Sequence, residues 1–218
     1  GLLVIDEQHR FGVGQRLMLA RKGRRTPHTL AMTATPIPRT LTLAQYGEMD
    51  VSRLDELPPG RQAIDTRVVS TGRLDDVASA LARHLEGGAQ AYWVCPMVRE
   101  HESEDIAAAE ARFAALRERF GNVVVLVHGQ LRPEEKDTAM ERFQRGEARL
   151  LVATTVIEVG VDVPNATLMV IEQAERFGLA QLHQLRGRVG RGAEKSVCLL
   201  LRGDTLSETP RRRLALMR

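Results

Sequence analysis

The chain has 218 residues, 43% of them hydrophobic, and its 31 Lys and Arg residues against 28 Asp and Glu residues give a formal net charge of +3. This composition is that of an ordinary globular protein, which excludes the disordered and collagen-like classes. No run approaches the roughly 18 consecutive apolar residues of a membrane helix, and the opening residues lack the order of a signal peptide, so we expect a soluble intracellular protein. At roughly 100–200 residues per domain, the length allows one large or two small domains.

The cysteines and the basic residues limit the chemistry. Cys95 and Cys198 each lie inside an apolar run, so we expect reduced, buried thiols and neither a disulfide framework nor a four-ligand metal site. Only Lys22, Lys136 and Lys195 are lysines, so 28 of the basic residues are arginines. Arginine binds phosphate well, but the base composition of a genome explains the excess equally, and the count leaves the partner undecided.

Two short apolar runs open the chain, at residues 2–5 and 29–35, and both predict buried strands. Because the sequence begins without Met and directly in an apolar run, we expect its first residue to lie inside a domain. The stretch DELPPGR at residues 55–61 combines two prolines and a glycine with charged residues, which is typical of a linker. We therefore place a domain boundary there.

Beyond the linker, apolar runs alternate with segments of helical periodicity. For example, Leu74, Val77, Leu81 and Leu85 share one helix face, and Pro133 followed by two glutamates marks a helix start. The alternation predicts an α/β fold with a parallel sheet covered on both faces, where ligands lie at the carboxyl ends of the strands. The expected strands are residues 64–69, 91–95, 123–127, 150–154, 167–171 and 196–201, and the expected helices are residues 74–85, 105–120, 133–145 and 180–186.

Two adjacent carboxylates follow the first strand, as in a Walker B arrangement. Asp6 is placed to hold Mg²⁺ through water, and Glu7 to orient or deprotonate an attacking water. A plain solvated loop carries the same pair often, so the pair alone does not establish catalysis. Tyr92 and Trp93 lie within an expected strand and are interpreted as core residues rather than base-stacking residues.

Four segments in order resemble the motifs of superfamily 2 helicases. DEQH at residues 6–9 is similar to motif II, TAT at 33–35 to motif III, TTVIEVGVDVP at 154–164 to motif V, and QLRGRVGR at 184–191 to motif VI. The longer stretches DEQHRFGV, TATPIPRTL, DELPPGR and FGLAQLHQLRGRVGR narrow the resemblance to the RecG family of branch-migrating DNA helicases. The transcription-repair coupling family Mfd shares much of this pattern, but its members usually have Glu where this chain has Gln8, and they lack ELPPGR.

The spacing of the two arginines of the last motif also indicates a phosphate-binding role without the resemblance. Arg188 and Arg191 stand three residues apart, and we expect Gly187 and Gly190 to leave open space around them. Two guanidinium groups there can converge on a γ-phosphate and stabilise the charge that develops during phosphoryl transfer. The alternative is a basic surface helix, which the glycines disfavour.

The resemblance implies RecA-like, P-loop NTPase-type parallel sheet domains, one partial and one essentially complete, with ATP and Mg²⁺ as cofactors. Its implied catalytic residues are Asp6, which also holds Mg²⁺, Glu7, Arg188 and Arg191, and its implied nucleotide-binding residues are Gly160, Asp162, Gln184, Arg188 and Arg191. Its implied coupling residues are Gln8, His9, Thr33 and Thr35, and its implied nucleic-acid contacts are Thr154, Thr155, His128, Gly129 and Gln130. An ordinary strand-end hydroxyl remains the alternative for Thr154, and a hydrogen-bonded core histidine for His9.

A phosphate loop needs Gly-Lys-Ser/Thr, and none of the three lysines follows a glycine, so motif I is absent from this sequence. By the resemblance, it lies upstream of Gly1. We therefore expect residues 1–55 to be the carboxyl part of a first RecA-like domain, 56–63 a linker, 64–205 a second such domain, and 206–218 the start of a helical segment.

The resemblance implies that the parent protein is an ATP-dependent double-strand-DNA translocase acting on Holliday junctions and stalled forks in recombination and repair. We expect a monomeric motor in the bacterial cytoplasm, associated with the nucleoid, and we expect the fragment itself not to hydrolyse ATP. Two alternatives remain: an Mfd-like translocase, and a non-enzymatic nucleic-acid-binding module descended from a motor. The acidic pair and the two arginines argue against the second, because a binding module needs neither half of a hydrolytic site.

Overall fold

The structure, a computed structural model, describes residues 1–6, 12, 18, 27–33, 50–54, 56, 61–97, 101–154 and 163–218. The chain divides into two compact units, Gly1–Asp55 and Glu56–Arg218. No helix within the described ranges is long and apolar enough to cross a membrane.

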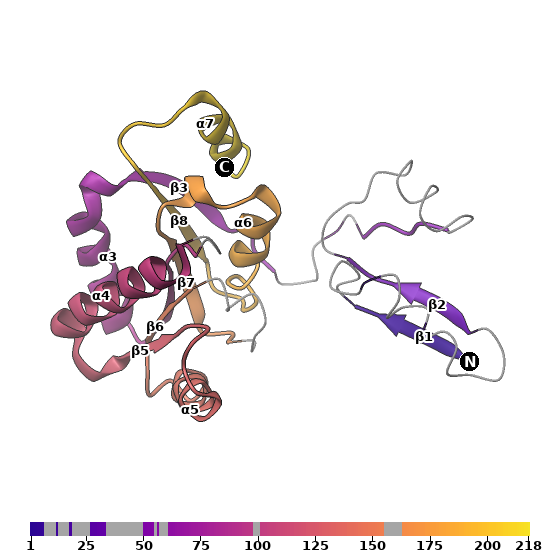
Figure 1. The fold of residues 1–218 in the computed structure, drawn as a ribbon, viewed down its shortest axis with the longest axis horizontal. Coiled ribbons are helices and arrows are strands. Elements are labelled where there is room, and N and C mark those ends of the chain that lie inside the picture. Colours follow the sequence, from indigo (N-terminus) through magenta and orange to yellow (C-terminus); the bar gives the residue numbers. More distant parts are fainter. Residues whose placement is uncertain are drawn as a thin grey trace. The chain divides into compact units, whose positions relative to one another are not determined.

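The first unit contains two parallel strands, β1 (Leu2–Ile5) and β2 (His28–Ala31), in which Leu2 lies opposite His28 and Ile5 opposite Ala31 (Figure 1). The predicted strand at residues 2–5 is confirmed, and the second strand ends earlier than predicted. The prediction that both strands are buried is wrong, because Leu2 is 70% exposed and Val4 and Leu30 are each 51% exposed. Pairing between two strands satisfies the backbone groups only along the edge that they share, and burying a face requires another layer packed on it.

The second unit is built on a sheet of six parallel strands in the order β3-β8-β7-β4-β6-β5. All six predicted strands are confirmed to within one residue at each end. Strands that are buried on both faces carry nearly continuous apolar sequence, which makes them easy to recognise. Their bounds are β3 Asp65–Ser70, β4 Gln90–Val94, β5 Val124–Val127, β6 Leu150–Ala153, β7 Ala166–Ile171 and β8 Val197–Arg202.

Helices cover both faces of this sheet (Figure 1). One face packs against α3 (Leu74–Glu86) and α4 (Glu102–Phe120), and the other packs against α5 (Pro133–Gln144), α6 (Leu179–Arg186) and α7 (Glu208–Ala215). Neighbouring strand residues point to opposite faces, so Trp93 enters the first core and Tyr92 the second. Both are almost fully buried, as predicted for core residues. The predicted helices are confirmed, although α4 begins three residues earlier than expected, in an acidic first turn that favours a helix N-terminus.

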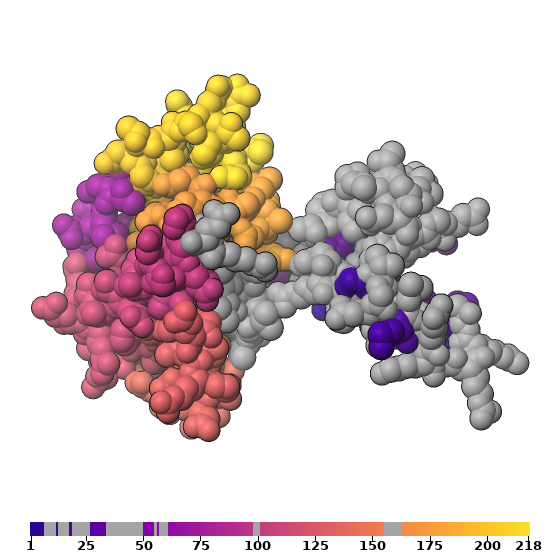
Figure 2. Space-filling model, in the orientation of Figure 1, coloured from indigo at the N-terminus to yellow at the C-terminus, as the bar shows by residue number. Residues whose placement is uncertain are grey.

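The last helix packs onto the region around α6. Leu214 and Met217 are buried, the Arg186 guanidinium donates to the Met217 carbonyl at 3.1 Å, and Arg213 donates to the Glu175 carbonyl at 2.5 Å. In Figure 2 the yellow surface of α7 lies directly on the orange surface that contains α6. This end of the chain is therefore integrated into the second unit. Short 3₁₀ turns at Thr71–Arg73, Gly121–Val123 and Ala174–Arg176 complete the described helical elements.

Candidate functional site

The acidic motif begins at the carboxyl end of β1. Asp6 directly follows the buried Ile5, and the Met32 amide donates to the Ile5 carbonyl at 2.8 Å, so Asp6 and Thr33 leave the same edge of the sheet. Both side chains are exposed. The other predicted members of these motifs, Glu7, Gln8, His9 and Thr35, lie outside the described residues.

The position of Asp6 suits Mg²⁺, which takes one or two carboxylates and completes its shell with waters and substrate phosphates. Among the residues that the structure describes, no group of three or more His, Cys, Asp or Glu side chains could hold a metal ion.

In the second unit, backbone hydrogen bonds continue one residue beyond the ends of three neighbouring strands, β7, β4 and β6. The Glu172 amide donates to Val94, the Cys95 amide to Ala153, and the Thr154 amide to Val127, at 2.9, 2.8 and 3.3 Å. These bonds place the residues that follow β7, β4 and β6 side by side along the carboxyl edge, with Thr154 next to the last residue of β5. The edge is where ligands bind in a parallel sheet of this kind.

Two predicted nucleic-acid residues lie together on this edge. Thr154 is completely buried, and His128, which follows β5, is 4% exposed. Neither the Thr154 Oγ1 atom nor either ring nitrogen of His128 has a hydrogen-bond partner within the described part of the chain. Gly129 and Gln130, also predicted contacts, are exposed in the turn that follows, whereas Thr155 lies outside the described residues.

The turn after His128 is exposed but held in place. Its backbone closes through the Leu131 amide and the His128 carbonyl at 3.3 Å, and the Lys136 ammonium donates to the Gly129 carbonyl at 2.7 Å. The Glu135 carboxylate accepts from the Arg132 amide at 2.9 Å at the start of α5. The loop is thus ordered before any ligand arrives, which lowers the entropic cost of binding.

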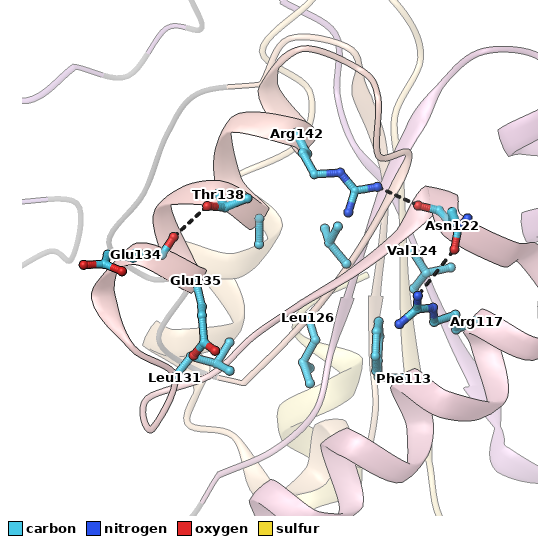
Figure 3. A pocket seen from close by; sticks show the side chains of 12 residues that line it. Phe113, Arg117, Asn122, Val124, Leu126, Leu131, Glu134, Glu135, Thr138 and Arg142 are labelled. Carbon is cyan, nitrogen blue, oxygen red and sulfur yellow. Dashed lines mark hydrogen bonds between the residues drawn. The ribbon is translucent and has the colours of Figure 1, made fainter.

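A cavity of about 890 Å³ opens beside this turn, along the edge strand β5 and between α4 and α5 (Figure 3). Phe113, Val124 and Leu126 form its apolar part, and Arg142 and Arg117 both donate to Asn122 at one end of it. Leu131 and Glu135 line its other end, which places the cavity next to the turn and not on the carboxyl edge itself.

The arginine motif lies beyond the end of α6. Gln184 is half-buried in the last turn of the helix, which closes when the Gly187 amide donates to His183 and the Arg188 amide to Leu185, each at 3.0 Å. Arg188 is half-buried and Arg191 exposed, with the Arg191 Nε atom donating to the Gly187 carbonyl at 3.2 Å. Both arginines therefore follow the helix and do not lie in it.

The expected role of Gly190 is wrong. We predicted that this glycine opens space around the arginines, but a Cβ atom there would lie 2.8 Å from Ile64 Cγ1. The residue also has φ = +75°, a conformation that side-chain-bearing residues rarely adopt. A glycine is thus required at position 190, because the backbone there turns tightly against Ile64, the residue that precedes β3. The predicted nucleotide residues Gly160 and Asp162 lie outside the described residues.

One polar network on the carboxyl edge was not predicted. The Glu172 carboxylate accepts hydrogen bonds from the Trp93 indole and from the Arg112 guanidinium, whose centre lies 5.7 Å from the centre of the Trp93 ring. Close by in the sequence, Arg176 pairs with the buried Asp105 at 3.0 Å. Since Glu172 directly follows an apolar strand, as Asp6 does, its position in the sequence was a signal that could have revealed it. Nothing in the helical pattern of α4 singles out Arg112.

The cysteines have no part in this chemistry. Both are buried and free, as predicted. Burial raises the pKa of Cys198 to about 12, and burial together with the nearby Glu172 also raises that of Cys95. Neither thiol is therefore a reactive thiolate near neutral pH.

Solved structures of known proteins share this architecture. The structure of RecG bound to a three-way DNA junction superposes with a TM-score of 0.77 and 44% identity, covering 99% of this chain and 27% of that one. Yeast (S. cerevisiae) Dbp5 bound to RNA and ADP BeF3 shares the fold, with a TM-score of 0.68 at 17% identity over 99% of this chain and 56% of that one. A parallel sheet of this topology, with polar motifs at its carboxyl edge, is that of a RecA-like helicase motor domain.

The chain belongs to the family described as the helicase conserved C-terminal domain, which matches residues 73–193. It is also 54% identical over 219 residues to the ATP-dependent DNA helicase RecG of Acidithiobacillus ferridurans, a match that covers all of this chain. The chain spans about a third of the length of that relative, 32%. The predicted resemblance to RecG-like helicases and the predicted α/β fold are thus confirmed.

Proposed function

We propose that this chain is part of an ATP-dependent double-strand-DNA translocase that drives branch migration of Holliday junctions and reversal of stalled replication forks. The observation that carries the proposal is the similarity, over essentially the whole chain, to a RecG captured on a three-way DNA junction. Branched or double-stranded DNA is then the partner, ATP and Mg²⁺ are the cofactors, and the motor works as a monomer in the bacterial cytoplasm, at the nucleoid.

In this proposal the residues of the predicted motifs serve the hydrolysis of ATP. Asp6 holds Mg²⁺ through water and Glu7 directs the attacking water, while Arg188 and Arg191 stabilise the charge on the transferred phosphoryl group. Gly160, Asp162 and Gln184 hold the nucleotide. Gln8, His9, Thr33 and Thr35 couple its hydrolysis to movement along DNA.

The carboxyl edge of β5 and β6 supplies the proposed contact to DNA. Thr154, Thr155 and the turn at His128, Gly129 and Gln130 bind the phosphate backbone, which fixes position without reading sequence. Support comes from the buried atoms of Thr154 and His128 that have no hydrogen-bond partner among the described residues, because a buried polar group left without a partner costs about 1–3 kcal/mol. A phosphate oxygen supplies the missing acceptor for a hydroxyl or ring N–H.

The test is ATP hydrolysis by the intact protein in the presence of three-way junction DNA. Arg188→Ala and Arg191→Ala should each lower the DNA-stimulated rate by about 10³–10⁵-fold, the effect of an arginine in related phosphoryl-transfer sites. Arg83→Ala, which removes an exposed arginine from α3, is the matched control and should leave the rate unchanged. Wild-type rates in both motif variants would refute the assignment.

A second measurement compares ATP hydrolysis by this chain alone with hydrolysis by the longer protein of which we propose it is part. Residues 1–218 contain no Gly-Lys-Ser/Thr sequence to hold the β- and γ-phosphates, so this chain alone should not hydrolyse ATP. Junction-stimulated ATP hydrolysis by purified residues 1–218 would show that this expectation is wrong. Displacement of a stalled RNA polymerase, instead of movement of a junction, would assign the motor to the Mfd type.

A further inference from the structure

The outer side of β5 is an edge of the sheet in the second unit. Among the described strands, β3 and β5 lie at its two edges, and β5 pairs with β6. The carbonyls of Val123 and Val127 accept hydrogen bonds at 2.8 and 3.3 Å from the residues that flank β6, so they face that strand. Because successive residues of a paired strand direct their backbone groups to opposite sides, those of Val124 and Leu126 face away from the sheet.

Three of these outward backbone groups have no hydrogen-bond partner within the described part of the chain. The Val124 amide donates to the Gly121 carbonyl, which leaves the Val124 carbonyl and both backbone groups of Leu126. Leu126 is half-buried and lines the cavity that lies between α4 and α5 along β5, so this part of the edge is open. Unpaired N–H and C=O groups on an edge strand are a template for another strand.

The opposite edge of the sheet differs from this one. β3 exposes Asp65 and Arg67, whose side chains pair at 2.5 Å. Charged side chains on an edge strand discourage pairing with another chain. β5 reads Val-Val-Leu-Val and carries no charge. The contrast indicates that the β5 edge can accept a further strand, whereas the β3 edge is protected against one.

The side chains of the cavity indicate which sequence such a strand should have (Figure 3). Arg117 and Arg142 both donate to Asn122 where β5 begins, and a guanidinium has five donors, so both can also bind a carboxylate. Phe113 on α4 supplies apolar surface, with the Arg117 guanidinium 5.7 Å from its ring centre. Glu135 lines the end of the cavity beyond β5, where it suits a basic side chain.

We propose that this cavity binds an extended segment of a partner protein, which adds to the sheet as a strand beside β5. The segment has an acidic side chain near Arg117 and Arg142, apolar side chains over Phe113, and a basic side chain near Glu135. Main-chain hydrogen bonds supply the affinity in this mode of recognition, and the side chains supply the specificity. This surface is distinct from the DNA contact of the proposed function, which lies on the carboxyl edge of the sheet.

The test uses two fluorescent peptides, EETVIVTKK and its reverse KKTVIVTEE, and measures their anisotropy with the intact protein. The first places its glutamates near the two arginines when it binds parallel to β5, and the second does so when it binds antiparallel. One of the two should bind saturably, and KKTVIVTKK, which has no glutamate, should bind about 3- to 20-fold more weakly. Absence of saturable binding by either peptide up to about 1 mM would overturn the proposal.

Methylation of the peptide nitrogens tests pairing with the backbone of β5. Alternate N–H groups of an added strand point toward its neighbour. Methyl groups on one alternate set of residues should therefore weaken binding by at least about tenfold, whereas methyl groups on the other set should leave the Kd nearly unchanged. Equal affinities of the two methylated peptides would show that the peptide does not add as a strand.

A charge reversal in the protein tests the acidic end of the segment. Arg117→Glu, on an exposed side chain, should weaken binding of the glutamate-containing peptide by about 3- to 20-fold and strengthen binding of KKTVIVTKK. Arg83→Glu, on an exposed side chain of α3, is the matched control and should change neither Kd. ATP hydrolysis stimulated by junction DNA should be the same in Arg117→Glu as in the wild type, so peptide binding and the proposed function can fail separately.

Two other occupants of the cavity would give different results. If three-way junction DNA displaced the bound peptide, the cavity would belong to the DNA-binding surface. If the intact protein sedimented as a dimer that Arg117→Glu dissociates, a second copy of the protein would cover the cavity. Either result would refute a partner segment at β5.

Discussion

Two strands with nearly the same sequence behave differently in the two units. β1 reads Leu-Leu-Val-Ile and β6 reads Leu-Leu-Val-Ala. All four residues of β6 are completely buried, whereas in β1 Leu2 is 70% exposed and Val4 is 51% exposed. The apolar run therefore determines that a strand forms, while its burial depends on the layers packed on both faces.

Hydrogen exchange should show the largest difference between the two strands. Local opening free energies range from near zero to the full stability of a domain, so amides in β6 should exchange at least ~10³-fold more slowly than those in β1. The measurement is exchange followed by NMR or mass spectrometry on the whole chain, with β4 and β7 as internal references. Equal protection in β1 and β6 would mean that the first unit is as well packed as the second.

Substitutions at matched positions should reproduce the difference in stability. Leu150→Ala, at the first residue of β6, removes a completely buried side chain and should lower the free energy of unfolding by about 2–5 kcal/mol. Leu2→Ala, at the first residue of β1, should change it by no more than about 0.5 kcal/mol. Urea unfolding followed by circular dichroism reports both, and similar costs for the two variants would contradict the comparison.

Most elements of the second unit could be predicted because each signal is local. The apolar strands, the periodic helices and the start of α5 at Pro133 depend on residues within a few positions of one another. The burial of β1 could not be predicted in the same way, since it depends on which layers pack against the strand.

The same reasoning separates the predicted from the unpredicted parts of the site. Thr154 and His128 were predicted because the resemblance places them in segments that follow apolar strands, whereas the network around Glu172 was missed because its partners come from distant segments. Arg112 meets Glu172 across 60 positions, and Arg176 meets Asp105 across 71. The requirement for glycine at position 190 arises from a contact with Ile64. Such contacts are properties of the folded sheet and leave no local pattern.

Substitution of Gly190 tests at a single residue how much close packing contributes to the stability of the second unit. Gly190→Ala places a Cβ atom against Ile64 in an unfavourable backbone conformation and should cost about 2–4 kcal/mol. Gly88 also has positive φ, at +86°, but nothing lies within 4 Å of an added Cβ, so Gly88→Ala should cost only about 1–2 kcal/mol of backbone strain.

Urea unfolding monitored by Trp93 fluorescence measures both glycine variants in the same unit. The difference between them isolates the contact with Ile64 from the strain of the backbone. If Gly88→Ala lowered the free energy of unfolding as much as Gly190→Ala, the packing against Ile64 would not contribute to the loss. Adding Ile64→Ala to Gly190→Ala should recover the part of the loss that comes from crowding, although Ile64→Ala alone is destabilising.

The smallest expected effect concerns His84 on α3. This side chain is half-buried where α3 packs against the sheet. Its Nε2 atom lies 3.1 Å from the Thr167 hydroxyl on β7, and burial lowers the pKa of His84 below its usual 6.5. The unfolded chain then binds a proton more readily than the folded chain, so stability should decrease as the pH falls below about 6.5. His84→Gln keeps a hydrogen-bonding group and removes the titration, so the free energy of unfolding should depend less on pH between about 5 and 7 than in the wild type. Because the ring is partly exposed and water screens its charge, this difference should stay below about 1 kcal/mol. If the free energy of unfolding of His84→Gln depended on pH as strongly as that of the wild type, packing of α3 on the sheet would not exclude water from the ring.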